Sequence, residues 1–407
     1  MNFGLNTGLL YWVGILIWIF SYVMIIYFIN KSKDDKKKKI AIFVCVAITT
    51  ILGFIVKPNN SDDIYYYIGV GRADSSFAEN PYENYFNEVQ QCHKEDPIIT
   101  EAPSLNVVYT YGPLWRNICK ALSTIQLNTM NEMLYLYKFV NVLIHLLNCV
   151  LIYKISKDKK ILKLGIYALN PLIIFECLIN CHNDIFVLFF VLLAIYLKQK
   201  DKIGLGVVSI LLGTLIKYIP VIFLPYIIGN KKIKNYIVYL VGFVIGYLGL
   251  SYLETGNFNN SFKVLQQTSL FANNWENILI SLKVSLSDTL KISFIAKIVF
   301  AIIFMTLVLK EYIKQESKPE TYRIIAMLFY LLVITNFRNW YITWIFALIP
   351  ILNKEGIFKI IAFSISALIS NSIFYMIGGG YIFAYLIFLT NIITYLILVF
   401  TIKIYEK

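Results

Sequence analysis

Apolar runs recur along almost the whole chain, and they constrain its fold more than any other feature. Thirteen of them are candidates to cross about 30 Å of hydrocarbon, the shorter ones with support from neighbouring segments. The chain is 58% hydrophobic and 15% charged, whereas a soluble domain is nearer roughly half apolar and a quarter charged. We therefore expect an all-α polytopic membrane protein with about 13 transmembrane helices. The predicted spans are Leu9 to Ile29, Ile40 to Val56, Glu132 to Tyr153, Ile161 to Ile179, Ile185 to Leu197, Ile203 to Ile216, Ile219 to Ile228, Tyr236 to Leu253, Ile292 to Leu309, Ile324 to Thr335, Tyr341 to Leu352, Ile357 to Tyr375 and Tyr381 to Ile402.

The basic residues indicate how these spans are oriented. Alternating the spans places seven loops and tails on one side, and they hold 25 of the 37 Lys and Arg residues. Lys and Arg gather on cytoplasmic loops, so we expect this side to be cytoplasmic, with the N-terminus outside and the C-terminus inside. The first span has no cleavage-like site and precedes KSKDDKKKK, so it is expected to stay as an anchor. Because the formal charge of +13 lies in such loop runs, no nucleic-acid partner is expected.

Two long segments, Lys57 to Asn131 and Glu254 to Lys291, fall on the outer side. Between Pro58 and Asn131 nine residues are acidic and four are basic, the reverse of the cytoplasmic bias. Loops of this length are usually functional or disordered, and the wealth of Tyr, Phe and Pro favours a folded one. Within it, Leu114 to Leu127 has the apolar spacing typical of an interfacial helix. The first outer loop is therefore expected to be partly helical.

Carboxylates and a histidine are expected to meet at the outer interface. Asp62 and Asp63 follow the second span, where partial desolvation can tune a carboxylate for general-base work; a solvated loop end is the alternative. The turn CHND, residues 181–184, brings His182 to the same surface, where a simple interfacial hydrogen bond is the alternative. Glu176 lies inside the preceding span, and an ionisable group there is a functional hypothesis by default.

Two cations are expected on the same side. Lys217 stands between GVVSILLGTLI and a proline, so the helix should break there, and open helix ends with a lysine make an anion site. Snorkelling of the lysine is the alternative. Arg338 lies in NFRNWYITW, where an aromatic belt explains the tryptophans but not the arginine. Cations for a phosphate and a carboxylate for a hydroxyl are what transfer from a lipid phosphate to an alcohol requires.

A series of short motifs resembles one enzyme superfamily. In order, "SDDIYYYIGVGR", "NPY" at residues 80–82, "YGPL" at 111–114, "NPLIIFE" at 170–176, "HND" at 182–184, "KYIPVIFLP" at 217–225 and "RNWYITW" at 338–344 are similar to motifs of multi-spanning GT-C glycosyltransferases, particularly bacterial mannosyltransferase-like members. The resemblance covers about Ile40 to Trp344. It implies a GT-C-type fold, a polyprenyl-phosphate-linked sugar donor, and transfer on the non-cytoplasmic face.

The resemblance also implies roles for residues. The catalytic aspartate of the family maps onto Asp63 or its neighbour Asp62, and the sequence leaves that choice open. Gly69 and Val70 stand where some members carry a further acid, and Tyr66 replaces an arginine, which leaves the sugar and acceptor open. The expected donor-phosphate ligands are Lys217, Arg338 and His182. The expected substrate-binding residues are Tyr65, Tyr66, Arg72, Asn80, Tyr82, Tyr111, Glu176, Asn183, Asp184 and Tyr341.

Three parts are expected along the chain. Residues 1–39 form an extra N-terminal transmembrane helix, outside the usual core, with a basic cytoplasmic loop. Residues 40–352 form the GT-C-like transmembrane catalytic core, with outer loops at 57–131 and 254–291. Residues 353–407 form a C-terminal transmembrane hairpin.

The leading hypothesis is an inverting hexosyltransferase, with mannose favoured, acting in cell-envelope glycan or glycolipid synthesis. Its acceptor is a lipid, a glycan or a protein. A transporter or lipid-carrier flippase is the main alternative, although the sequence lacks the two related halves common in transporters. A non-catalytic scaffold is a third.

No cofactor is assigned; a divalent cation on the acidic pair is left open. Cys92 and Cys119 are the only candidates for an outer-face disulfide.

Overall fold

The computed structural model describes residues 5–59, 61–106, 109–229, 233–256 and 338–377, together with scattered positions between 285 and 306. All regular elements in this described part are helical, as expected. Four of its helices contain segments long and apolar enough to span a membrane, or five if one bent pair counts as a span. The four helices are α1 (Leu5–Lys31), α2 (Asp35–Ile55), α7 (Met130–Ile155) and α12 (Ile233–Thr255).

The expected number of about 13 spans is not confirmed. Three other predicted spans form helices too short to cross a bilayer alone: α9 (Asp184–Gln199), α10 (Ile203–Thr214), and η2 (Ile219–Phe223) with α11 (Leu224–Ile228). The predicted spans Ile324 to Thr335 and Tyr381 to Ile402 lie outside the described residues, as do most of Ile292 to Leu309 and of the second outer loop.

The chain divides into two compact units, each assembled from separate segments. The first comprises residues 1–46, 152–173 and 272–407, and the second comprises residues 47–151 and 174–271. These units interleave the three parts expected from the sequence, and that three-part division stays a prediction.

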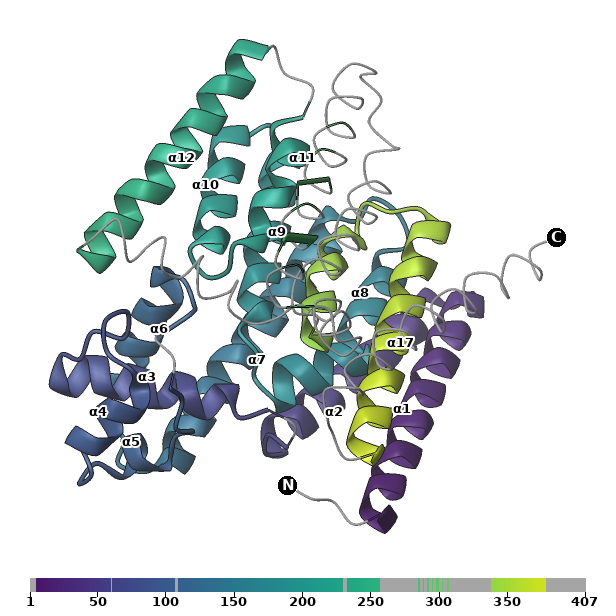
Figure 1. Cartoon of the computed structure of the whole chain (residues 1–407). Coiled ribbons are helices and arrows are strands. Elements are labelled where there is room, and N and C mark those ends of the chain that lie inside the picture. Colours follow the sequence, from purple (N-terminus) through teal and green to yellow (C-terminus); the bar gives the residue numbers. More distant parts are fainter. Residues whose placement is uncertain are drawn as a thin grey trace. The chain divides into compact units, whose positions relative to one another are not determined.

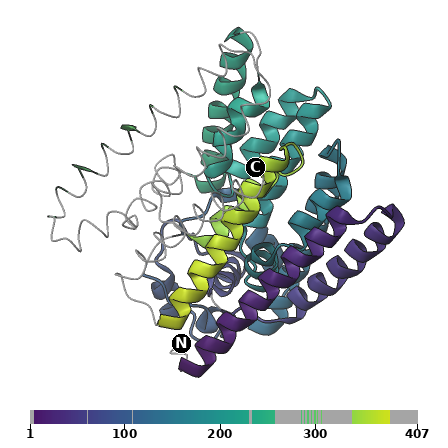
Figure 2. The ribbon, with the colours of Figure 1, turned by 90° about the vertical axis from the view of Figure 1, so that its right-hand side faces the viewer.

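In the first unit, helix α1 packs beside α17 (Lys354–Ile377) and also contacts α8 (Lys160–Ala168) (Figure 2). The Tyr22 hydroxyl of α1 donates a hydrogen bond of 3.0 Å to the carbonyl of Ile166. The buried amide of Asn170 then donates to the Tyr22 hydroxyl at 3.3 Å and to the Ser364 hydroxyl at 3.0 Å. The first helix is thus tied into the unit by a buried polar network, and is not a loosely attached anchor.

In the second unit, α10 packs against both α9 and α12 (Figure 1). The loop predicted to be the first outer one folds as a helical group, and the Tyr137 hydroxyl of α7 donates a hydrogen bond to the Cys119 carbonyl within it. That loop is more helical than predicted, since it forms four helices where one was expected. They are α3 (Asp63–Phe77), α4 (Phe86–Cys92), α5 (Pro97–Glu101) and α6 (Pro113–Ser123), the last ending four residues before the predicted Leu127.

A buried carboxylate holds α3 and α6 together. Asp74 of α3 accepts hydrogen bonds from Arg116 Nε at 2.6 Å and from Lys120 Nζ at 2.9 Å, both from α6. The polar face of α6 is therefore directed in part at Asp74, which is why its sequence resembles an interfacial helix. The predicted disulfide is wrong: all six cysteines are free, and Cys119 is buried whereas Cys92 is exposed.

One predicted span is interrupted, and a predicted break between two other spans is present. The run from Ile161 to Ile179 ends its α-helix at Ala168 and continues after Pro171 as the π-helix η1 (Ile173–Ile179). Proline cannot donate the backbone bond that a continuous helix needs. The break expected around Lys217 is confirmed, because α10 ends at Thr214 and a 3-10 helix follows. The second break lies in the same unit as the candidate site and carries Lys217.

Candidate active site

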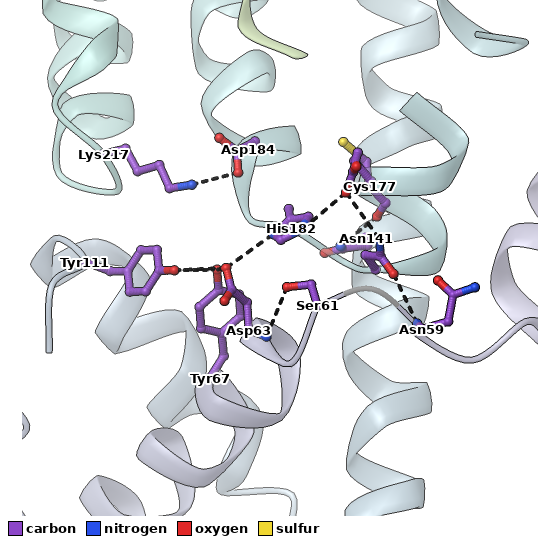
Figure 3. A network of polar contacts seen from close by, with 12 residues as sticks. Asn59, Ser61, Asp63, Tyr67, Tyr111, Asn141, Cys177, His182, Asp184 and Lys217 are labelled. Carbon is purple, nitrogen blue, oxygen red and sulfur yellow. Dashed lines mark hydrogen bonds and ion pairs between the residues drawn. The ribbon is translucent and has the colours of Figure 1, made fainter. Parts of the chain in front are cut away.

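Asp63 begins helix α3 and lies at the centre of a polar network (Figure 3). A carboxylate in the first turn of a helix is stabilised by the positive end of the helix dipole. Its side chain is 34% exposed, so it is both held and accessible. The neighbouring Asp62 occupies the N-cap position without a side-chain capping bond and is exposed. The two carboxylates that the sequence could not separate therefore have different surroundings.

Two tyrosines and a histidine converge on one oxygen of Asp63. The hydroxyls of Tyr67 and Tyr111 lie 3.4 and 3.3 Å from Oδ2, and 3.0 Å from each other. The imidazole Nδ1 of His182 lies 3.4 Å from the same oxygen. Burial, with Tyr111 and Asp63 nearby, holds the pKa of Tyr67 well above its usual value, so its hydroxyl keeps a proton to donate.

His182 lies between two carboxylates in the turn that joins η1 to α9. Its side chain is fully buried, and Nε2 lies 3.3 Å from Oε2 of the buried Glu176. The turn is tight, because Cys181 has a positive φ of 58° and the His182 backbone amide donates to the Glu176 carbonyl at 3.0 Å. Single-turn π-helices are frequent at functional sites, and here one delivers Glu176 to the imidazole.

The charges of this network oppose the effect of burial. Burial alone would raise the pKa of Asp63, but the hydrogen bond and charge of His182, with the charge of Lys217, lower it overall. Burial alone would lower the pKa of His182, but Asp63 and Glu176 raise it to about 9. At neutral pH His182 is therefore an imidazolium, and Asp63 is ionised and able to accept a proton.

A lysine lies beside this network. Lys217 Nζ makes an ion pair of 2.7 Å with the buried Asp184, and lies 5.5 Å from the centre of the Tyr111 ring (Figure 3). Two backbone hydrogen bonds dock the YGPL segment onto the end of α10: Gly112 N to Ile216 O and Leu114 N to Leu215 O, both 3.0 Å. This docking fixes Tyr111 and Lys217 with respect to each other.

Several polar atoms of the turn are buried without a hydrogen bond to the rest of the described chain. They are both side-chain amide atoms of Asn183, Oε1 of Glu176 and Oδ1 of Asp184. Buried polar groups normally find a partner, so these atoms retain capacity for a bound polar molecule.

The tyrosines predicted to bind substrate differ in exposure. Tyr66 and Tyr82 are buried in an aromatic cluster, where both contact Tyr109. The Tyr82 hydroxyl also donates to the backbone carbonyl of Tyr111 at 3.0 Å. Tyr65 and Tyr111 are part-exposed. Of these two, Tyr111 contacts Asp63, while Tyr82 supports the segment that carries Tyr111.

Two further predicted residues have local partners. Arg72 Nε donates to Asp96 at 2.8 Å, and Asn80 Oδ1 accepts from the Tyr82 backbone amide at 3.1 Å. Their roles toward a substrate stay predictions.

Arg338 and Tyr341 belong to the first unit, so their predicted part in the site stays a prediction. There the Arg338 guanidinium lies 5.9 Å from the Trp340 ring centre, and Tyr341 stacks on Trp344 at 4.7 Å.

Among the residues that the structure describes, no group of three or more His, Cys, Asp or Glu side chains could hold a metal ion. The divalent cation stays an open alternative.

Sequence reasoning missed a second set of polar residues next to the His182 turn. Lys138 and Asn141 lie in the middle of α7, are buried, and donate to backbone carbonyls of η1. The signal was available, because a lysine inside an apolar run is expensive and seldom incidental.

A comparison with protein families decides the class of the chain. The family model described as "Alpha-(1->6)-mannopyranosyltransferase, N-terminal domain" matches residues 3–230, more than half of the chain. The chain belongs to this family. This mannosyltransferase-family protein is therefore a membrane glycosyltransferase, and the GT-C mannosyltransferase-like resemblance is confirmed. The match includes the first helix. No curated protein and no solved structure matches the chain.

Proposed function

We propose that this enzyme transfers a mannose residue from a polyprenyl-phosphate-linked donor to an acceptor hydroxyl on the extracytoplasmic face of the membrane. The family description supports mannose as the sugar, and the apolar helices support a location in the membrane. Lys and Arg are concentrated in the loops assigned to the cytoplasm, and the Asp63 segment belongs to the acidic outer loop. A lipid-linked donor suits a site on that side, because the donor is then delivered within the membrane.

One observation carries the proposal: Asp63 is an accessible carboxylate kept ionised by an imidazolium and two hydroxyl donors. A general base must be deprotonated at working pH and able to reach the acceptor hydroxyl. Asp62 has no such support, so we assign the base to Asp63.

In the proposed step, Asp63 takes the proton of the acceptor hydroxyl while the acceptor oxygen attacks the anomeric carbon. The bond between that carbon and the phosphate oxygen breaks, and the lipid phosphate leaves with the electron pair. One substitution inverts the anomeric centre, so a β-linked donor gives the α-linked product that the family description names. Glu176 is a positioning residue, because its carboxylate favours the charged form of His182.

Lys217 is proposed to stabilise the departing phosphate. Preorganised charges aimed at the site of developing charge usually make the largest contribution to catalysis. The 2.7 Å pair with Asp184 fixes the ammonium beside Tyr111 before a phosphate arrives. Tyr65 and Tyr111 are proposed to contact the sugar, and Asn183 to hydrogen-bond to it.

The proposal is tested with purified protein in detergent, synthetic β-linked polyprenyl-phosphate mannose and octyl α-mannoside as acceptor. We expect a disaccharide with an α-(1→6) linkage, identified by NMR. GDP-mannose in place of the lipid-linked donor should give no product. Product from GDP-mannose alone, or an unchanged lipid-linked donor with every acceptor alcohol tried, would overturn the proposal. A transporter or flippase would leave the donor intact.

A further inference from the structure

Helix α7 carries a row of polar side chains along one face of an otherwise apolar span. Lys138, Asn141, His145 and Asn148 follow one another at intervals of three and four residues, which places them on one side of a helix. All four are buried. The opposite side is apolar and exposed, as expected of a surface that faces lipid, at Phe139, Leu143, Leu146, Leu147 and Val150.

The polar row meets backbone carbonyls on both sides of His182. Lys138 Nζ donates to Leu178 O at 2.8 Å and to Ile179 O at 3.1 Å. Asn141 Nδ2 donates to Cys177 O at 3.0 Å (Figure 3). Farther along α7, Asn148 Nδ2 donates to Ile185 O at 3.2 Å, just after the turn.

The end of the π-helix explains why these donors are needed. The carbonyls of Phe175 and Glu176 accept from the backbone amides of Asn180 and His182, at 2.9 and 3.0 Å. The next three carbonyls, at residues 177–179, receive the side chains of Asn141 and Lys138. Inside a membrane every backbone polar group must be satisfied within the protein. A positive charge at the C-terminal end of a helix is also favoured by the helix dipole.

The turn that these contacts hold is strained and carries the network around Asp63. Cys181 adopts a left-handed conformation without being glycine, which persists only when surrounding contacts impose it. Its neighbour His182 must lie within reach of Asp63 and Glu176 at once. A shift of about 1 Å at such a point can cost about 100-fold in rate.

We propose that Lys138 is a positioning residue for the transfer reaction, because its ammonium group caps the end of η1 and thereby holds the His182 turn against Asp63. The proposal deepens the proposed function and rests on it for the role of His182. Lys138 does not contact the reacting groups; it acts through the backbone of residues 178 and 179.

The first test needs no substrate. Lys138→Met keeps the length of the side chain and removes its donors and charge, while Lys154→Met, an exposed position in the last turn of the same helix, is the matched control. Amide hydrogen exchange measured by mass spectrometry should become at least 10-fold faster in the peptide covering residues 176–184 of Lys138→Met. The control should exchange as wild type.

The second test is kinetic and uses the lipid-linked mannose donor. Lys138→Met should lower kcat by about 100-fold with KM for the donor within about threefold of wild type. The acid limb of its kcat–pH profile should move to higher pH, because a displaced His182 no longer favours the ionised form of Asp63. A loss of protein stability alone would leave that profile in place.

Unchanged exchange at residues 176–184, or a wild-type kcat and pH profile in a folded Lys138→Met protein, would overturn the proposal. If that variant does not fold, Lys138→Leu, which also removes the donors and the charge, carries the same two measurements with the same criteria. Asp63→Asn, assayed in parallel, separates the two ideas. Full activity in Asp63→Asn refutes the proposed function, whereas the exchange result bears on Lys138 independently.

Discussion

His182 and Asp63, far apart in the sequence, form an ion pair with 3.4 Å between Nδ1 and Oδ2. The pair joins helix α3 to the turn between η1 and α9. Because of this pair, the Asp63 carboxylate stays ionised although it is partly desolvated. The chemistry proposed for this glycosyltransferase depends on that pair.

Replacing His182 should change the pH dependence of catalysis. The hydrogen bond and charge of His182 are the main causes that lower the pKa of Asp63, so this pKa should rise in His182→Asn. The acid limb of the kcat–pH profile should therefore move to higher pH. The kcat at neutral pH should fall by about 10- to 100-fold. His93→Asn is the control, because His93 pairs with Glu79 at 2.9 Å elsewhere in the outer loop. An acid limb that is identical in wild type and His182→Asn would contradict the assigned role.

The same histidine should make stability depend on pH. Its pKa is raised from 6.5 to about 9 in the folded protein, so the folded state binds its proton more tightly than the unfolded state. The stabilisation is complete below pH about 6.5 and is lost as pH rises through about 9. Thermal unfolding in detergent should show Tm falling across this window in wild type. The fall should be smaller in His182→Asn, and an equal slope in both proteins would count against the ion pairs.

Lys217 should contribute to the stability of the fold and to binding of the lipid-linked donor, and the two contributions can be measured separately. Lys217→Ala leaves Asp184 buried and unpaired, which typically costs about 3–5 kcal/mol. Adding Asp184→Asn should recover most of the lost Tm, because the buried charge is then gone. It should not recover the KM for the lipid-linked donor, which we expect to rise at least 10-fold in both variants. Recovery of KM together with Tm would mean that Lys217 acts only as the partner of Asp184.

Gly112 should be intolerant of even one methyl group. A Cβ there would collide with the backbone carbonyl oxygen of Leu215, which cannot move without breaking the docking bonds to α10. We expect Gly112→Ala to lower stability by about 1–3 kcal/mol and to reduce kcat, because Tyr111 and Lys217 are displaced. Gly242→Ala is the control, since a Cβ at Gly242 meets nothing within 4 Å. Equal Tm and kcat in the two variants would refute the prediction.

The sequence predicts the membrane class and the partners of Asp63 better than it predicts the shape of the outer loop. The lengths of the apolar runs locate α7 and α12 within a few residues, and a proline locates the break near Lys217. The helices α3, α4 and α5 were missed because their apolar residues face one another around Asp74 and the aromatic cluster, a pattern that becomes visible only after packing.

The sequence could not decide between Asp62 and Asp63, because the two residues are identical and adjacent. It depends on the helix start, which directs Asp63 at Tyr67, Tyr111 and His182 and leaves Asp62 in solvent. The π-helix could not be predicted either, because the donors that satisfy the carbonyls at its end come from α7.

The most direct measurement compares Asp63→Asn with Asp62→Asn in the lipid-linked donor assay, with both proteins shown by thermal unfolding to be folded. A general base contributes about 100- to 10,000-fold, so we predict that Asp63→Asn loses that factor in kcat while Asp62→Asn stays within about threefold of wild type. Full activity in folded Asp63→Asn, or the larger loss in Asp62→Asn, would contradict the account.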